Sequence, residues 1–157
     1  METVLILDFG AQYSQLIARR VREQNVYCEV KPCSISPDEI RKLAPIGIIL
    51  SGGPQSVYES VSLHVDPALF SLGIPVLGIC YGCQLMAYSL GGTVAAATEA
   101  TAREYGKTLT EFDTESAIFH GLPASSVTWM SHGDYISQVP DGFTVTAKTA
   151  VCPTAAM

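Results

Sequence analysis

Two cysteines directly after a short apolar run, Cys80 and Cys83, could carry nucleophilic or redox chemistry. The local string is Gly78-Ile79-Cys80-Tyr81-Gly82-Cys83-Gln84. Small residues around a cysteine at the end of a strand are typical of a nucleophile elbow, the sharp turn from a strand into a helix. The helix dipole would lower the pKa of the Cys80 thiol. The string therefore predicts Cys80 as a nucleophile, and the backbone N–H of Tyr81 as a donor to the oxyanion formed by its attack.

A second donor is expected from Ser51-Gly52-Gly53-Pro54, which follows the preceding apolar run. The carboxyl ends of parallel strands meet at one edge of a sheet, so this turn is expected beside Cys80. Its glycines allow a peptide group to approach a ligand closely, which favours the Gly53 N–H as donor. The string could also be an ordinary turn. A phosphate loop is a third interpretation, but Pro54 lacks an amide N–H and no P-loop lysine follows.

The same cysteines support a different hypothesis. Cys80-Tyr81-Gly82-Cys83 is a C-x-x-C sequence at the start of a helix, as in thioredoxin-type dithiols. Three features count against an oxidoreductase: long α/β units precede the motif, no tryptophan adjoins Cys80, and Gln84 and the upstream Gly-Gly-Pro are left unexplained.

The elements that must position these residues alternate between strand and helix as far as Gly92. Strands are expected over 4–9, 26–30, 46–50 and 75–79, and helices near 13–21, 37–43, 66–72 and 81–90. Ser36, Pro37 and Glu39 form a capping-box sequence at the start of the second helix. This alternation predicts a mostly parallel sheet with helices on both faces. Later strands are expected over 93–97, 107–112, 127–130 and 143–148, with a helical turn near 116–119, and we treat residues 1–157 as one domain.

Composition restricts the function classes. The 157 residues are 48% apolar and 15% charged, with a net charge of −6. An acidic chain without basic patches is unlike a nucleic-acid or membrane-surface binder. We expect no signal peptide, and no apolar run is long enough to span a membrane. Five cysteines without a secretion signal predict reduced thiols and a cytoplasmic protein.

At this point the chain resembles the class I glutamine amidotransferase family, in the string 50–54 and in the string 78–84. Three further stretches resemble the GMP synthase branch of that family: Ile6-Leu7-Asp8-Phe9-Gly10-Ala11-Gln12-Tyr13, Arg103-Glu104-Tyr105-Gly106 and Trp129-Met130-Ser131-His132-Gly133-Asp134. The resemblance implies a flavodoxin-like three-layer α/β sandwich. It also implies that Cys80 attacks the carboxamide of glutamine, releasing ammonia and leaving a thioester that water hydrolyses.

The resemblance also assigns the other site residues. Gly53 and Tyr81 would supply the oxyanion donors, and Gln84 would hold the amino-acid end of glutamine. Ser131, His132, Gly133 and Asp134 would line the same pocket. Two simpler interpretations stay open, because Gln84 could be a solvated helix residue and His132 could make only a structural hydrogen bond. No metal ligand and no bound cofactor are expected within residues 1–157.

The resemblance implies a synthetase domain, either fused to this chain or separate, that uses ATP and Mg²⁺ to convert XMP and the ammonia into GMP. It also implies a homodimer for the full-length protein. The family's catalytic His-Pro-Glu string does not occur here, and we expect a sequence truncated before it. Residues 1–157 alone should then have little glutaminase activity. Another class I amidotransferase and a non-catalytic regulatory α/β domain stay open as alternatives. Cys83 departs from the family, which commonly has methionine there, and could trap Cys80 as a disulfide.

Overall fold

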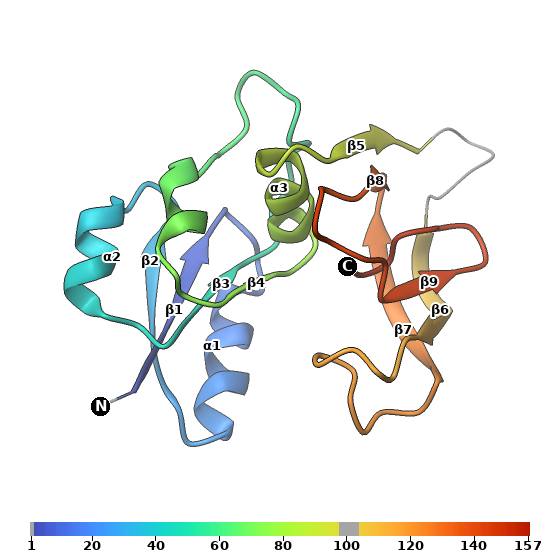
Figure 1. The fold of residues 1–157 in the computed structure, drawn as a ribbon, viewed down its shortest axis with the longest axis horizontal. Coiled ribbons are helices and arrows are strands. Elements are labelled where there is room, and N and C mark those ends of the chain that lie inside the picture. The colour runs from blue at the N-terminus through green and yellow to red at the C-terminus, as the bar shows by residue number, and fades with distance from the viewer. Residues whose placement is uncertain (1, 98–103) are drawn as a thin grey trace. The chain divides into compact units, whose positions relative to one another are not determined.

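The computed structural model describes residues 2–97 and 104–157. The chain divides into two compact units, residues 1–86 and 87–157. Figure 1 labels the helices and strands of both units. The expectation of a single domain stays a prediction.

The first unit is built on a four-stranded parallel sheet. Its strands are β1 (Thr3–Asp8), β2 (Tyr27–Pro32), β3 (Gly47–Leu50) and β4 (Val76–Gly78), in the order β2-β1-β3-β4. Its helical elements are α1 (Ser14–Glu23), α2 (Pro37–Leu43), the 3₁₀ helix η1 (Pro67–Ser71) and α3 (Tyr81–Ser89), which continues into the second unit. This strand order is the one found in flavodoxin-like folds, and the predicted fold class is confirmed.

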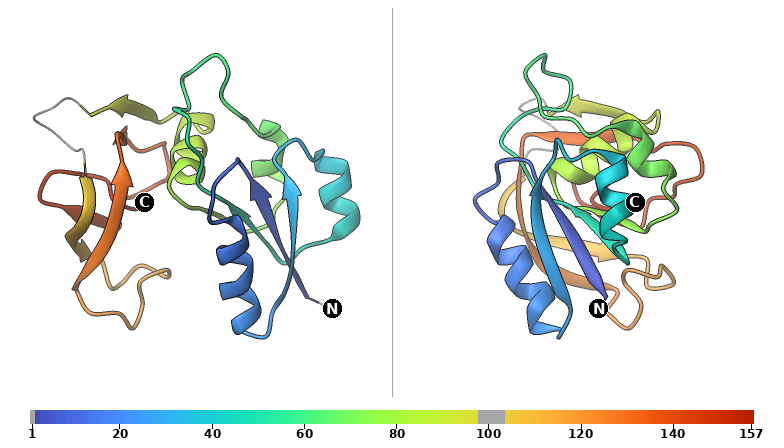
Figure 2. Two further views of the ribbon diagram at one scale, coloured as in Figure 1. Left: turned by 180° about the vertical axis from the view of Figure 1, so that it is seen from behind. Right: turned by 90° about the vertical axis from the view of Figure 1, so that its left-hand side faces the viewer.

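Both faces of this sheet are apolar, as in other parallel sheets covered by helices. On one face Ile6 and Cys28 pack against Ala18 of α1, and all three are almost completely buried. Leu7 and Leu50 lie on the opposite face and are fully buried. The right-hand view of Figure 2 shows α1 and α2 on opposite sides of β1 and β2, which gives the three layers of the sandwich.

The start of α2 agrees with the sequence prediction, whereas the segment at η1 does not. At α2 the Ser36 Oγ accepts a hydrogen bond from the Glu39 N–H at 3.3 Å, and a Glu39 carboxylate oxygen accepts one from the Ser36 N–H at 3.1 Å. This is the predicted capping box. The segment expected as a helix over 66–72 is instead the short 3₁₀ helix η1, capped by Asp66. Among the described residues, no helix is long and apolar enough to cross a membrane.

The second unit is built from antiparallel strands. Strand β5 (Thr93–Ala96) pairs with β8 (Asp134–Gln138), and β6 (Glu104–Phe112) pairs with both β7 (Ser125–His132) and β9 (Ala147–Thr149). Strand β8 was not predicted. The strand expected over 143–148 was wrong at its start, because residues 143–146 are irregular and only 147–149 pair with β6. The expected helical turn near 116–119 is present as successive hydrogen-bonded turns.

One face of the β6–β7 hairpin carries exposed apolar side chains. Leu109 lies opposite Val127, and both are more than half exposed. Lys107 lies opposite Trp129, with its Nζ 5.8 Å from the centre of the indole ring. The Trp129 side chain is 76% exposed, so this cation–π contact holds the ring at the surface rather than in a core.

Candidate functional site

Cys80 occupies a strained backbone position between β4 and α3. Its φ is +53°, in the left-handed region that non-glycine residues rarely adopt. A residue held there costs about 1–3 kcal/mol and persists only where its surroundings impose it. Hydrogen bonds fix the turn on both sides: the Ile79 N–H donates to the Leu50 carbonyl at 2.9 Å, and the Gln84 N–H donates to the Cys80 carbonyl at 3.1 Å. The structure therefore has the sharp strand-to-helix turn that the sequence predicts.

The glycines on either side of Cys80 are required by close backbone packing. A Cβ atom at Gly78 would lie 2.6 Å from both the Cα and the N of Cys83. A Cβ atom at Gly82 would collide with the Leu50 carbonyl oxygen and would lie 2.6 Å from the Leu50 Cβ. Real Cβ atoms do not approach backbone this closely. The first turn of α3 can lie against the ends of β3 and β4 only because both positions are glycine.

The Gly-Gly turn after β3 lies against this elbow. A Cβ atom at Gly52 would be 3.7 Å from the Cys80 Cβ, and one at Gly53 would be 3.2 Å from Cγ of Tyr81. The turn is fixed from behind by Ser51, which is fully buried and accepts a hydrogen bond from the Phe9 N–H at 3.2 Å. The structure thus places Gly52 beside Cys80 and Gly53 beside the ring of Tyr81.

Tyr81 is held rigidly although its expected role involves only its backbone. Its side chain is 1% exposed, and its hydroxyl donates a 2.6 Å hydrogen bond to the Leu63 carbonyl. Its ring lies 5.4 Å from that of Phe9, centre to centre. These contacts fix the Tyr81 N–H, which hydrogen-bonds to the Cys80 sulfur and lowers the pKa of that thiol. Gln84 is half-buried one helical turn after Cys80, as its spacing predicts.

The pKa of Cys80 is nevertheless raised, because desolvation by burial has a larger effect than the hydrogen bond from the Tyr81 N–H. As a residue, Cys80 is exposed. The pKa of Cys83 is raised to about 11 by burial and by the neighbouring Cys80. The expected lowering of the Cys80 pKa by the helix therefore does not dominate in this structure. Dithiol oxidoreductases use a cysteine of lowered pKa, so the raised pKa of both cysteines counts against that hypothesis.

The remaining predicted residues belong to the second unit, at the adjoining ends of β7 and β8. Ser131 is exposed, and Gly133 and Asp134 are half-buried. The Gly133 carbonyl accepts a 2.8 Å hydrogen bond from the Ala97 N–H, which fixes this turn to the end of β5. The His132 imidazole points into its own unit, with its Nε2 3.3 Å from the Oε2 of Glu104. Its side chain therefore makes the structural hydrogen bond that was one of the two interpretations.

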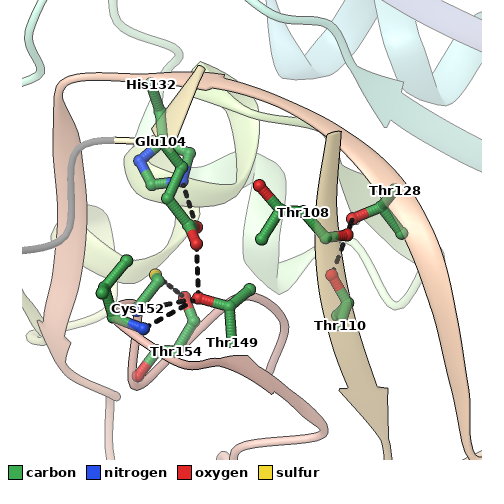
Figure 3. A network of polar contacts seen from close by, with 9 residues as sticks. Glu104, Thr108, Thr110, Thr128, His132, Thr149, Cys152 and Thr154 are labelled. Atoms are coloured by element: carbon green, nitrogen blue, oxygen red, sulfur yellow. Dashed lines mark hydrogen bonds and ion pairs between the residues drawn. The ribbon is translucent and has the colours of Figure 1, made fainter. Parts of the chain in front are cut away.

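Sequence reasoning missed the partners of His132. Glu104 was noticed only as part of the string 103–106, whose Arg103 lies outside the described residues. Thr149 donates a 2.6 Å hydrogen bond to the other carboxylate oxygen of Glu104, and it accepts one from the Cys152 N–H at 2.9 Å. Figure 3 shows this network. Its members come from three distant parts of the chain, and no local spacing in the sequence relates them.

The first unit also has an open cavity away from the elbow. It has a volume of about 440 Å³ and is bordered by β2, α2 and the turn between them. Its lining residues are Lys31, Pro32, Ser34, Ile35, Glu39, Lys42 and Leu43. None of the predicted site residues is among them.

A comparison with protein families leads to the same class of protein as the elbow and the fold. Residues 5–157 match the family described as glutamine amidotransferase class-I. The match extends over both units of the structure. The chain belongs to the class I glutamine amidotransferase family.

Curated relatives named "GMP synthase [glutamine-hydrolyzing]" are similar over almost the whole chain. Those from Clostridium botulinum (strain Alaska E43) and Thermobifida fusca are each 56% identical, over 156 and 157 residues respectively. The one from Geobacillus kaustophilus is 54% identical over 156 residues. Each match covers 99% of this chain, but the chain spans only about 30% of the length of these relatives.

Solved structures have the same fold. A GMP synthase subunit from Thermoplasma acidophilum superposes with a TM-score of 0.85 at 31% identity, covering 98% of this chain and 76% of its own. A glutamine amidotransferase from Thermotoga maritima superposes with a TM-score of 0.74 at 21% identity, covering 96% of this chain and 68% of its own. The second likeness concerns the fold alone.

Proposed function

We propose that this chain is the glutamine-hydrolysing part of a GMP synthase and that Cys80 is its nucleophile. The observation that carries the proposal is the left-handed backbone of Cys80, held at a glycine-lined elbow with Gly52 beside it. The identity to GMP synthases supports the choice of this branch of the family. We further propose that the protein acts in the cytoplasm.

In the first step the Cys80 sulfur attacks the carboxamide carbon of glutamine, and the carbonyl oxygen becomes an oxyanion. The backbone N–H groups of Gly53 and Tyr81 would stabilise that charge. Removing one oxyanion donor costs about 3–4 kcal/mol in enzymes where it has been measured. A backbone donor cannot be removed by truncating a side chain. Mutation can instead disturb the position of these amides through the residues that pack behind them, Phe9 and Ser51.

The raised pKa of Cys80 means that the thiol needs a proton acceptor before it can attack. The resemblance to the family assigns this role to a histidine and a glutamate of a His-Pro-Glu string. That histidine would pass the proton to the departing ammonia and then activate the water that hydrolyses the thioester. Gln84 is proposed to hold the amino-acid end of glutamine.

The released ammonia is proposed to serve a synthetase partner, in the same chain or as a separate subunit. That partner would use ATP and Mg²⁺ to activate XMP, and ammonia would displace AMP to give GMP. We also propose a homodimer for the full-length protein. Within residues 1–157 we assign no residue to ATP, Mg²⁺ or XMP.

The test uses the longest form of the protein that its gene encodes, with its synthetase partner. GMP formation is measured with glutamine and, separately, with ammonium as the nitrogen source. Cys80→Ala should lower the glutamine-dependent rate by at least about a thousandfold and leave the ammonium-dependent rate unchanged. Equal rates for Cys80→Ala and the unaltered protein with glutamine would refute the proposal.

Cys83→Ser is the matched control for a cysteine substitution in the same helical turn. It should retain glutamine-dependent activity, because the proposed mechanism uses one thiol. Loss of activity in both variants, with ammonium-dependent activity intact, would instead support a mechanism that requires both cysteines.

A further inference from the structure

The second unit contains a cluster of three different metal-binding side chains. Glu104 is at the start of β6, His132 is at the end of β7, and Cys152 follows β9. One oxygen, one ring nitrogen and the sulfur of these residues all lie within 4.8 Å of one another. Figure 3 shows the three side chains converging between the strands.

Burial makes this cluster different from an exposed group of acidic residues. The side chains of Glu104 and His132 are only 5% and 14% exposed, and Cys152 is 2% exposed. A buried carboxylate is costly unless a charge or several hydrogen bonds compensate it. Beside Glu104, the described residues offer only the imidazole and the Thr149 hydroxyl.

One further contact resembles the outer shell of a metal centre. Thr149 donates to one carboxylate oxygen of Glu104 at 2.6 Å and so orients the other toward His132. Outer-shell hydrogen bonds of this kind orient metal ligands. In addition, the Nδ1 of His132 is buried and has no hydrogen-bond partner among the described residues. The described protein atoms therefore satisfy only one of the two ring nitrogens of this imidazole.

The donor set favours one class of ion. Thiolate and imidazole ligands suit divalent ions of borderline softness, whereas Ca²⁺ and Mg²⁺ prefer oxygen ligands alone. Zinc is commonly bound by three protein ligands of these types, with water in the fourth position.

We propose that Glu104, His132 and Cys152 form a site for a zinc-like divalent cation in the second unit. On binding, the Cys152 thiol releases its proton to water, and the sulfur exchanges its 3.4 Å contact with the Thr154 carbonyl for the metal. The ion would join the end of the β6–β7 hairpin to the segment after β9. Its three protein ligands leave one coordination position for water, and the site differs from our expectation that residues 1–157 contain no metal ligand. The test of this site does not depend on the proposed glutamine chemistry, because it measures metal binding and uses no activity assay.

The test uses Co²⁺ as a spectroscopic probe on the full chain after removal of metals with a chelator. Cys80→Ser and Cys83→Ser are combined as the background, so that the C-x-x-C pair cannot bind the probe. One equivalent of Co²⁺ should produce visible ligand-field bands and a thiolate-to-metal band in the near ultraviolet, and Zn²⁺ should abolish both. Cys152→Ser should abolish the thiolate band.

A matched pair at Thr149 keeps all three ligands in place and tests the outer shell. Thr149→Val should weaken Co²⁺ binding by about tenfold, whereas Thr149→Ser, which keeps the hydroxyl, should bind as the background does. Circular dichroism verifies the fold of each variant, and the Thr149 pair still decides if Cys152→Ser does not fold. Absence of a thiolate band at saturating Co²⁺, or a band unaffected by both Cys152→Ser and Thr149→Val, would overturn the proposal.

Discussion

The close approach at Gly78 gives the sharpest test of how the elbow is built. In Gly78→Ala the new Cβ would meet the Cα and N of Cys83 at 2.6 Å, whereas ordinary contact begins at 3.4 Å. Backbone atoms cannot rotate away as the end of a side chain can. The first turn of α3 must therefore move from β4 by at least about 0.8 Å, the difference between these two distances.

This displacement has two consequences of different size. Overpacking of this kind lowers the free energy of unfolding by about 1–3 kcal/mol, which corresponds to roughly 2–4 °C in Tm for each kcal/mol. The effect on catalysis should be larger, because a misplacement of about 1 Å can cost on the order of a hundredfold in rate. We expect glutamine-dependent GMP formation to fall by about that factor, with ammonium-dependent formation unchanged.

Gly47→Ala is the matched control, because Gly47 is also a strand glycine of the same sheet. A Cβ atom there would meet only the Pro75 carbonyl oxygen, at an ordinary 3.8 Å. This variant should unfold within about 0.5 kcal/mol of the unaltered chain and keep its glutamine-dependent rate. Thermal unfolding and the two activity assays are measured for both variants. The reasoning is refuted if Gly78→Ala and Gly47→Ala behave alike in both measurements.

Three further predictions concern single contacts of the first unit. The pKa of Cys83 is about 11 in the fold against 9.0 in the free thiol, so its contribution to stability is complete below pH 9 and is lost as the pH rises toward 11. Cys83→Ala should therefore flatten the pH dependence of urea unfolding between pH 9 and pH 11, and an unchanged profile would contradict the burial of this thiol. Ser36→Ala removes the capping box and should lower the free energy of unfolding by about 1 kcal/mol in urea, whereas Ser34→Ala, two residues earlier in the turn, should change it by less than half as much. Tyr81→Phe removes the hydrogen bond to the Leu63 carbonyl and should cost about 1 kcal/mol in thermal unfolding, and a variant as stable as the unaltered chain would show that this bond contributes nothing.

The elbow could be predicted from sequence because its geometry is encoded locally. Gly78 and Gly82 are needed where backbone meets backbone, and glycine is the residue that permits this. The position of Gly53 beside Tyr81 followed from topology, since parallel strands end at one edge of the sheet. These inferences required only the order of the strands and the residue types at their ends.

The unpredicted features depend on packing between distant parts of the chain. Strand β8 contains one buried apolar residue, Ile136, so its periodic signal is weak. The contact of His132 with Glu104 depends on the antiparallel register of β6 and β7 across 28 positions. The raised pKa of Cys80 arises from burial, which no local motif reports. Sequence reasoning therefore reached the geometry of the elbow but not the electrostatic environment of Cys80.

The exposed Trp129 determines which optical signals can be used with this protein. It is the chain's single tryptophan, and its indole is already 76% exposed in the folded state. Its emission maximum should therefore move little when the chain unfolds, and an unchanged spectrum would be no evidence of a stable fold. The same ring, held under the Lys107 ammonium, should shift to the blue when another surface covers the β6–β7 hairpin. Intrinsic fluorescence is thus a reporter of association at this hairpin rather than a reporter of folding.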